Sequence, residues 1–340
     1  MSSAATLIVG PSWVGDMVMA QALLLLLKQR DPERDLDVLA PDWSLPIVSR
    51  MPQVRRGIAV QTGHNEIGLR KRWRISRELR QQGYDQAIIL PRSLKAALIP
   101  WFASIERRTG FRGESRYGLI NDVRPFDRDI LDQTVKCFAA LGLEPGESLA
   151  EIPNPVLRVS GANQDALLDK LDIRGDRPVI AMMPGAEYGP AKCWPIEYFS
   201  ELASLLVADG YDIWVLGSAS DACPGKQIAA QSAAINLCGK TSLADVIDLL
   251  GLARQAVSND SGLLHIAAAV GTHVHGIYGS STPRFTPPLT GKRDMHYLGI
   301  ECSPCFERRC PLQHLRCLKE ILPATVHNAI LARRQTFNTT

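Results

Sequence analysis

Residues 256–271, AVSNDSGLLHIAAAVG, constrain the fold of this chain more than any other stretch. An apolar, β-prone run ends in the residues NDSG, and an apolar helix is expected to begin at once. Asp260 or Ser261 can cap that helix, and Gly262 permits the close approach of a ligand or another backbone. The free N–H groups of a first helical turn bind anions, and open α/β sheets bind ligands where their strands end. The segment therefore predicts a site for a ligand that carries a diphosphate.

Short apolar runs alternate with helical patterns along the chain. Strands are expected at 6–9, 36–39, 86–90, 179–183, 213–216, 235–237, 256–258 and 274–278, and helices at 17–27, 195–209, 243–254, 263–270 and about 323–334. This rhythm is typical of parallel sheets that are covered by helices on both faces. We therefore expect an α/β protein built from doubly wound, Rossmann-like domains.

The length of the chain indicates two domains. A chain of 340 residues with 46% hydrophobic and 21% charged residues can build two ordinary soluble cores. A polar stretch with prolines and glycines, 153–175, is the expected linker. We assign 1–160 to an N-terminal, acceptor-binding domain that faces a C-terminal, donor-binding domain, 161–322, across a cleft. By analogy, 323–340 is expected to pack back on the first domain.

Charge and hydropathy exclude several classes of protein. The net charge of +3 is too small to indicate nucleic-acid binding, so no nucleic-acid partner is expected. The longest apolar run near the N-terminus, 22–27, is too short to span a bilayer, and no signal-peptide pattern is present. We therefore expect a cytoplasmic protein whose eight cysteines are mostly reduced thiols.

A first loop, GPSWVGDMVMAQ at 10–21, follows the strand at 6–9 and opens a helix. Asp16 falls at or near the N-terminus of that helix. It either caps the helix or acts as a general base, a role that typically contributes about 10²–10⁴-fold in rate. A helix N-terminus weakens a carboxylate as a base, so a base near neutral pH would need partial burial. The glycine spacing is not G-x-G-x-x-G, which argues against an NAD-dependent oxidoreductase.

A second loop, PGAEYGPAKCWP at 184–195, follows the strand at 179–183. Lys192 lies just before the next helix, where its ammonium can meet a phosphate as a point charge. The alternative is an ordinary surface lysine. Gly185 leaves room for a ligand, and Glu187 is a candidate for orienting Lys192 or for binding a sugar hydroxyl.

His265 falls in the first turn of the helix expected at 263–270. A lone histidine on an apolar helix is usually a hydrogen-bonded core residue. Its place beside the anion site makes contact with a phosphate or a sugar an equal alternative. Metal binding is disfavoured because no second ligand lies at His-x₃-His spacing.

Arginines and lysines gather in the first half of the chain. Arg92 and Lys95 follow the strand at 86–90 and should face the cleft, where they would suit an acidic acceptor. Arg112 and Arg116 join them as candidate acceptor-binding residues. Most runs of charge are merely solvated faces. The basic excess can also hold the protein against an anionic membrane leaflet, at about 1 kcal/mol per residue.

Four cysteines lie close together near the C-terminus. Cys302, Cys305, Cys310 and Cys317 read C-x₂-C-x₄-C-x₆-C, and four thiolates at short spacing can hold a structural zinc ion. The alternative is a loop of reduced thiols, because the spacing does not match paired C-x₂-C sites. Catalytic zinc is not expected, since four protein ligands leave no open position.

The three loops together resemble the ADP-heptose:lipopolysaccharide heptosyltransferases, and the resemblance runs from Leu7 to about Leu331. NDSGLLHIAAA at 259–269 is similar to the nucleotide-sugar diphosphate motif of that family, and RRTGFRGESRYGLIND at 107–122 and FTPPL at 285–289 also match in order. The resemblance implies a GT-B architecture of two facing Rossmann-like domains. It also implies transfer of L-glycero-D-manno-heptose from ADP-heptose to the first heptose of the lipopolysaccharide inner core. That reaction inverts the anomeric centre and needs no metal or other cofactor.

The resemblance also assigns roles to residues. Asp16 resembles the base that deprotonates the acceptor hydroxyl, and Lys192 resembles the residue that neutralises the leaving diphosphate. A helix N-terminus contributes only about 0.3–2 kcal/mol toward an anion, so Lys192 must supply much of the rest. The cysteine cluster is not general to the family and is not expected to take part in the shared chemistry. The donor-binding loop is matched by Asp260, Ser261, Gly262 and His265.

Two other classes of function remain open at this point. Another GT-B enzyme, such as a sugar-nucleotide epimerase, would turn over the nucleotide sugar with no acceptor present. A non-enzymatic nucleotide-sugar-binding protein would need Lys192 and the 259–262 loop but could dispense with Asp16. The presence of Asp16 weighs against that class.

Overall fold

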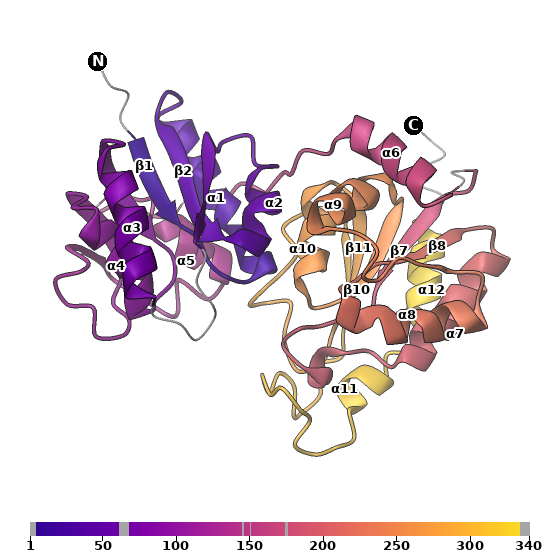
Figure 1. Ribbon diagram of the computed structural model, residues 1–340. Coiled ribbons are helices and arrows are strands. Elements are labelled where there is room, and N and C mark those ends of the chain that lie inside the picture. Colours follow the sequence, from indigo (N-terminus) through magenta and orange to yellow (C-terminus); the bar gives the residue numbers. More distant parts are fainter. Residues whose placement is uncertain (1–4, 61–67, 145, 150, 174–175, 334–340) are drawn as a thin grey trace. The chain divides into compact units, whose positions relative to one another are not determined.

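The computed structural model describes residues 5–60, 68–144, 146–149, 151–173 and 176–333 (Figure 1). The chain divides into two compact units, Met1–Arg158 and Val159–Thr340. Each unit holds one six-stranded sheet in which neighbouring strands run parallel. The predicted α/β class with two doubly wound sheets is therefore confirmed. No helix within the described ranges is long and apolar enough to cross a membrane.

The first unit alternates strands and helices as a doubly wound sheet requires. Its strands are β1 (Ala5–Val9), β2 (Asp35–Pro41), β3 (Arg56–Val60), β4 (Tyr84–Ile89), β5 (Arg107–Phe111) and β6 (Asp122–Arg124). Its helices are α1 (Val14–Arg30), α2 (Leu45–Val48), α3 (Leu69–Arg80), α4 (Leu94–Phe102) and α5 (Thr134–Ala140), with a 3₁₀ turn, η1, at Asp42–Ser44. The spatial order β3-β2-β1-β4-β5-β6 places the switch point between β1 and β4.

Both faces of the first sheet are buried at its central strand β1, in which every residue is buried and all but Thr6 are apolar. Leu7 and Val9 of β1 share a core cluster with Leu79 of α3 and Ala97 of α4. Ile8 is also buried and points to the opposite face, as the two-residue period of a strand requires. This packing fixes β1 beside β4, so the loops that follow these two strands leave the sheet side by side.

The second unit repeats the plan. Its strands are β7 (Val179–Met183), β8 (Asp212–Val215), β9 (Ile235–Asn236), β10 (Gln255–Asn259), β11 (His273–Tyr278) and β12 (Arg293–Tyr297). Its helices are α6 (Gly161–Lys170), α7 (Ile196–Ala208), α8 (Ala222–Gln231), α9 (Leu243–Leu252), α10 (Gly262–Ala269), α11 (Arg316–Lys319) and α12 (Pro323–Ala332), with 3₁₀ turns η2 (Pro190–Lys192) and η3 (Ala219–Asp221). The spatial order β12-β11-β10-β7-β8-β9 places the switch point between β7 and β10.

The predicted linker, 153–175, contains a helix that the polar composition concealed. Helix α6 begins after Ser160, whose hydroxyl accepts a hydrogen bond from the backbone N–H of Asn163. The Asn163 side chain donates to Asp248 of α9 at 2.8 Å, and Leu167 is buried. Helix α6 is therefore part of the second unit rather than a linker.

The C-terminal helix α12 corrects the prediction that 323–340 packs back on the first domain. Val326 and Ile330 lie in one core cluster with Leu206 of α7, inside the second unit. The apolar side of α12 thus packs with α7 on the same face of the second sheet. Residues 334–340 lie outside the described residues.

Candidate active site

Two loops meet at the switch point of the second sheet. The loop 184–195 follows β7, the segment 260–262 follows β10, and these two strands are neighbours. Lys192 Nζ lies 2.5 Å from Asp260 Oδ2, and the two side chains are 17% and 5% exposed. The fold thus joins two predicted site residues that are 68 positions apart in the chain. A switch point is where doubly wound sheets bind their ligands.

Asp260 is held by two hydroxyl groups that sequence reasoning missed. Ser281 Oγ donates to Asp260 Oδ2 at 2.5 Å, and Thr286 Oγ1 donates to Oδ1 at 3.4 Å. A carboxylate repels the phosphates of a nucleotide, whereas it attracts and orients an ammonium group. The contacts of Asp260 therefore indicate a residue that positions Lys192. The signal for its partners lay in the stretch GSSTPRFTPPL, where hydroxyl residues follow a buried strand.

Asn259 fixes the loop that carries Lys192, and sequence reasoning passed over it. Its Nδ2 donates to the carbonyl of Pro184 at 2.6 Å, and its Oδ1 accepts from the backbone N–H of Trp194 at 2.9 Å. One buried amide thus ties both ends of the loop 184–195 to the end of β10. An amide can do this because it is both donor and acceptor.

Ser261 occupies the N-cap position of α10, but its side chain accepts no hydrogen bond from the first turn. Its hydroxyl lies 3.2 Å from that of Ser258 instead. Ser261 therefore lies at the predicted N-cap position, but its side chain does not make the hydrogen bond of a helix cap. The first-turn N–H groups, which begin at Gly262, keep the positive end of the helix next to the Lys192–Asp260 pair. The Lys192 ammonium and the N-terminus of α10 together form a suitable site for an anion.

His265 lies within α10 and is only 4% exposed. Burial lowers its pKa to about 4; the Asp260 carboxylate raises the pKa and the Lys192 ammonium lowers it, both by less. The imidazole is therefore neutral at pH 7 and adds no positive charge to the site. A neutral imidazole favours a core position for His265, or contact with a sugar hydroxyl, over contact with a phosphate.

Replacing His265 with glutamine is expected to flatten the pH dependence of the unfolding free energy between about pH 4 and 6.5. In that range the unfolded histidine binds a proton that the folded one does not, so the wild-type protein loses stability as the pH falls, by up to about 3 kcal/mol. Urea unfolding of both proteins across this range measures the difference. Equal slopes in the two proteins would show that His265 titrates normally.

Only glycine fits at position 185, because the Asp221 side chain occupies the space that a Cβ would need. A Cβ at this position would lie 2.4 Å from Asp221 Oδ1, so the space predicted for a ligand is bounded by a carboxylate. Asp221 is held in turn by a capping box with Ser218, which follows β8. Glu187 is exposed, and its contact with a sugar stays a prediction.

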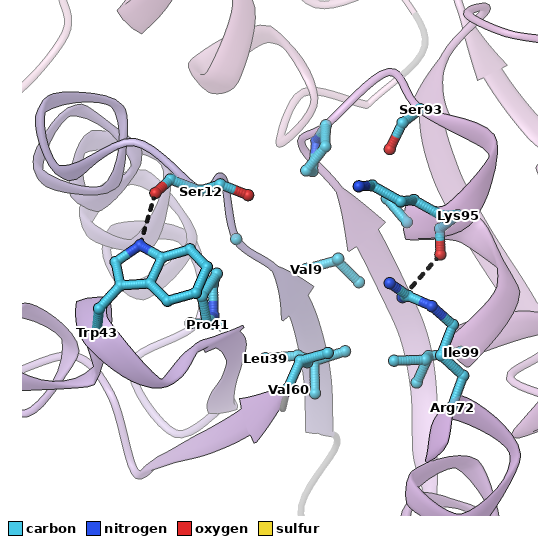
Figure 2. Close-up of a pocket in the computed structure, with 14 residues that line it drawn as sticks. Val9, Ser12, Leu39, Pro41, Trp43, Val60, Arg72, Ser93, Lys95 and Ile99 are labelled. Atoms are coloured by element: carbon cyan, nitrogen blue, oxygen red, sulfur yellow. Dashed lines mark hydrogen bonds between the residues drawn. The ribbon is translucent and has the colours of Figure 1, made fainter. Parts of the chain in front are cut away.

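The switch point of the first sheet carries a pocket (Figure 2). It is lined by the loops after β1, β2 and β4 and by the start of α4. Figure 2 shows Trp43 Nε1 donating to the carbonyl of Ser12 at 3.0 Å on one side, and Arg72 donating to the carbonyl of Lys95 at 2.9 Å on the other. The first bond joins η1 to the loop after β1, and the second joins α3 to α4, so the walls of the pocket are held in place.

Asp16 lies in the first turn of α1 and is partly buried, as the hypothesis of a general base requires. The N-cap of α1 is Trp13, which puts Asp16 inside the helix start. The loop that lines the pocket, through Gly10 and Ser12, leads directly into this turn.

The four candidate acceptor residues fall into two groups. Arg92 and Arg112 are exposed, and Lys95 is partly buried and lines the pocket. Arg116 is only 4% exposed, and its guanidinium donates to the carbonyls of Pro91 and Phe111. Burial lowers the pKa of Arg116. Arg116 thus braces the loops that follow β4 and β5, whereas Arg92 lies over the ring of Phe126 and Arg112 over that of Tyr117.

The four cysteines of the predicted zinc site all lie in the second unit. All are free thiols, and within the described ranges no three of their sulfur atoms lie within 4.8 Å of one another. Burial is the larger cause, and the three neighbouring thiols the smaller, of a rise in the pKa of Cys317 to about 11. This thiol is therefore protonated at neutral pH. Structural zinc at these cysteines stays a prediction, because a bound zinc ion would itself deprotonate its thiol ligands.

The fold and the site define a class of protein, the GT-B glycosyltransferases. The structure of E. coli ADP-heptose lipopolysaccharide heptosyltransferase II matches with a TM-score of 0.86 and 37% identity, over 97% of this chain and 99% of that one. Both have the two-domain α/β architecture of GT-B enzymes, in which each domain is built on a parallel sheet.

Within that class, the chain belongs to glycosyltransferase family 9, the heptosyltransferase family, whose family model matches residues 72–316. Lipopolysaccharide heptosyltransferase 2 of Salmonella typhimurium is 42% identical over 298 residues, which cover 84% of this chain and 86% of that protein. Lipooligosaccharide heptosyltransferase 2 of Haemophilus influenzae is 42% identical over 300 residues, with the same coverage. The family resemblance expected from the three loops is confirmed.

Proposed function

We propose that this chain transfers L-glycero-D-manno-heptose from ADP-heptose to the first heptose of the lipopolysaccharide inner core. The observation that carries the proposal is the Lys192–Asp260 pair at the start of α10, in a member of family 9. A lysine and a helix N-terminus at a switch point form a site for a diphosphate. The names of its relatives, heptosyltransferase 2 of lipopolysaccharide or lipooligosaccharide, support the same acceptor class.

The donor site stabilises ADP as it leaves. Negative charge grows on the diphosphate as the bond to the anomeric carbon breaks, and the Lys192 ammonium and the N–H groups of α10 are already in place to meet it. Asp260 positions the ammonium, and Asn259 holds the loop on which Lys192 lies. These protein groups supply the stabilisation themselves, so the proposed reaction requires no metal cofactor.

The acceptor site activates the nucleophile. Asp16 accepts the proton of the acceptor hydroxyl. At the same time the oxygen of that hydroxyl bonds to the anomeric carbon, and the bond between this carbon and ADP breaks. One displacement inverts the anomeric centre. Arg92, Lys95 and Arg112 hold the anionic inner core, since guanidinium and ammonium groups pair with phosphate and carboxylate. Arg116 keeps their loops in place.

The proposal is tested by ADP release from ADP-heptose, with and without a mono-heptosylated core acceptor, in the presence of EDTA. We expect ADP only with the acceptor, in an amount equal to a product that carries one additional heptose. Turnover without the acceptor would indicate an epimerase-type or hydrolytic reaction. Binding of ADP-heptose without turnover would indicate a binding protein. Either result would overturn the proposal.

We also propose a cytoplasmic protein that touches the anionic leaflet of the inner membrane through α3. This helix exposes Arg70, Lys71 and Arg74 around Trp73, which is 51% exposed. Cations and tryptophan are the side chains that favour an anionic interface. Vesicles of phosphatidylglycerol should sediment the protein and vesicles of phosphatidylcholine should not; no sedimentation with either would contradict the contact.

A further inference from the structure

A second cluster of polar side chains lies on the outer strands of the second sheet. His273 and His275 alternate along β11, and Asp294 and His296 alternate along its neighbour β12, so all four share one face. The ligand atoms of His273, His275 and Asp294 lie within 4.8 Å of one another. His296 Nε2 lies 3.4 Å from His275 Nδ1. His275 is fully buried and His273 is 7% exposed, so these two imidazoles are shielded from bulk solvent, whereas Asp294 and His296 are partly exposed.

The hydrogen bonds of Gln255 determine which nitrogen of His275 is available. Gln255 Nε2 donates to the carbonyl of Ile330 at 3.2 Å, so Gln255 Oε1 is the atom that faces His275 Nε2, at 2.8 Å. An amide oxygen only accepts, which places the proton of His275 on Nε2. The lone pair of Nδ1 is left on the side of Asp294 Oδ2, 4.0 Å away, and of His296. Histidines that bind metals are oriented by this kind of second hydrogen bond.

We propose that His273, His275 and Asp294 bind one divalent transition-metal ion of the zinc type, with His296 as the fourth ligand. Imidazole and carboxylate are the donors that zinc takes in proteins, whereas Mg²⁺ and Ca²⁺ prefer oxygen ligands. In the metal-free protein His273 Nε2 and Asp294 Oδ2 share a hydrogen bond of 2.7 Å. Metal binding replaces this hydrogen bond, and the proton moves to Nδ1 of the neutral His273 imidazole, which leaves the Nε2 lone pair for the ion.

The ion has a structural role. His273 is the first residue of β11, whereas the Lys192–Asp260 pair follows the carboxyl ends of the strands. Four protein ligands leave no open position for a substrate. The ligands join the edge strand β12 to β11, and Gln255 extends the connection to β10 and α12. The inference is independent of the proposed heptosyl transfer.

Arg333 tunes the affinity of the site. Its Nη2 and Nε donate to the two oxygens of Asp294, at 2.7 and 3.0 Å, and so orient the carboxylate. The same guanidinium repels a divalent cation, although its 43% exposure lets solvent screen that repulsion. Replacing Arg333 with glutamine is therefore expected to tighten metal binding severalfold.

The test is calorimetric titration of untagged, full-length protein with Zn²⁺, after treatment with EDTA and dialysis. We expect one equivalent to bind, and the thermal unfolding midpoint to rise with Zn²⁺ but not with Mg²⁺. His273→Gln is expected to weaken binding by at least about tenfold. His296→Gln, at a partly exposed position, gives a second variant if His273→Gln fails to fold.

Cys305→Ser is the matched control, because the cysteine loop is the other zinc-type candidate in this unit. Zinc affinity should be unchanged in Cys305→Ser. Binding that is lost in Cys305→Ser and kept in the histidine variants would place the ion at the cysteines and overturn the inference. The absence of any heat or midpoint shift at Zn²⁺ on the order of 1 mM would overturn it as well.

Discussion

Replacing Lys192 with alanine is expected to lower kcat by about 10²–10³-fold, because a positioned cation at a developing anion is worth about 3–4 kcal/mol. The N–H groups of α10 remain in the variant, but a helix end alone contributes only about 0.3–2 kcal/mol. Steady-state ADP release with saturating acceptor measures the loss. The matched control is Lys226→Ala, which removes an exposed lysine of α8 in the same unit and should keep full activity.

The stability of the Lys192 variant separates catalysis from folding. Alanine leaves the Asp260 carboxylate, 5% exposed, with the hydroxyls of Ser281 and Thr286 as its remaining partners. The expected loss of unfolding free energy is smaller than the roughly 3–5 kcal/mol of a fully buried pair, since Lys192 is 17% exposed. Adding Asp260→Asn should restore the stability and not the turnover. A Lys192→Ala protein that keeps more than a tenth of the wild-type kcat would contradict the proposed role.

Replacing Asp16 with asparagine is expected to lower kcat by about 10²–10⁴-fold while the Kd for ADP stays within about twofold. Asparagine keeps the shape of the side chain in the first turn of α1 and removes the base. We expect ADP affinity to be unaffected because the proposed ADP site lies in the second unit, around Lys192. ADP release measures kcat, and calorimetry with ADP measures the affinity.

Asp42→Asn is the control for the loss of one negative charge in the same unit. Asp42 is an exposed acidic residue in the first turn of η1, in the same unit, and its variant should retain activity. If Asp16→Asn unfolded or lost ADP binding, Asp16 would be a structural residue instead of a base.

The strands that sequence reasoning located are those with continuous apolar runs. Val179–Met183 was predicted with both bounds, because a central parallel strand is apolar on both faces. Strands β3, β5, β6 and β12 were missed because each begins with a charged residue. Arg107 of β5 is neutralised by Asp122 and Glu144, both 2.9 Å away, and such partners are not visible in a local pattern.

The sequence identified residues of the candidate site but not the contacts between them. Lys192 and Asp260 were each identified in their own loop, but their pairing depends on β7 and β10 being neighbours, which the order of strands along the chain does not reveal. Ser281 and Thr286 were missed for the same reason. Arg116 shows the converse: a run of arginines does not indicate which one is buried against carbonyl groups.

The position of the donor diphosphate is measured most directly by a crystal structure with ADP-heptose bound. We expect phosphate oxygens at hydrogen-bond distance, about 3 Å, from Lys192 Nζ and from the first backbone N–H groups of α10. Asp260 should still contact the same ammonium. A nucleotide sugar bound elsewhere, with no phosphate oxygen near Lys192, would contradict the proposed donor site.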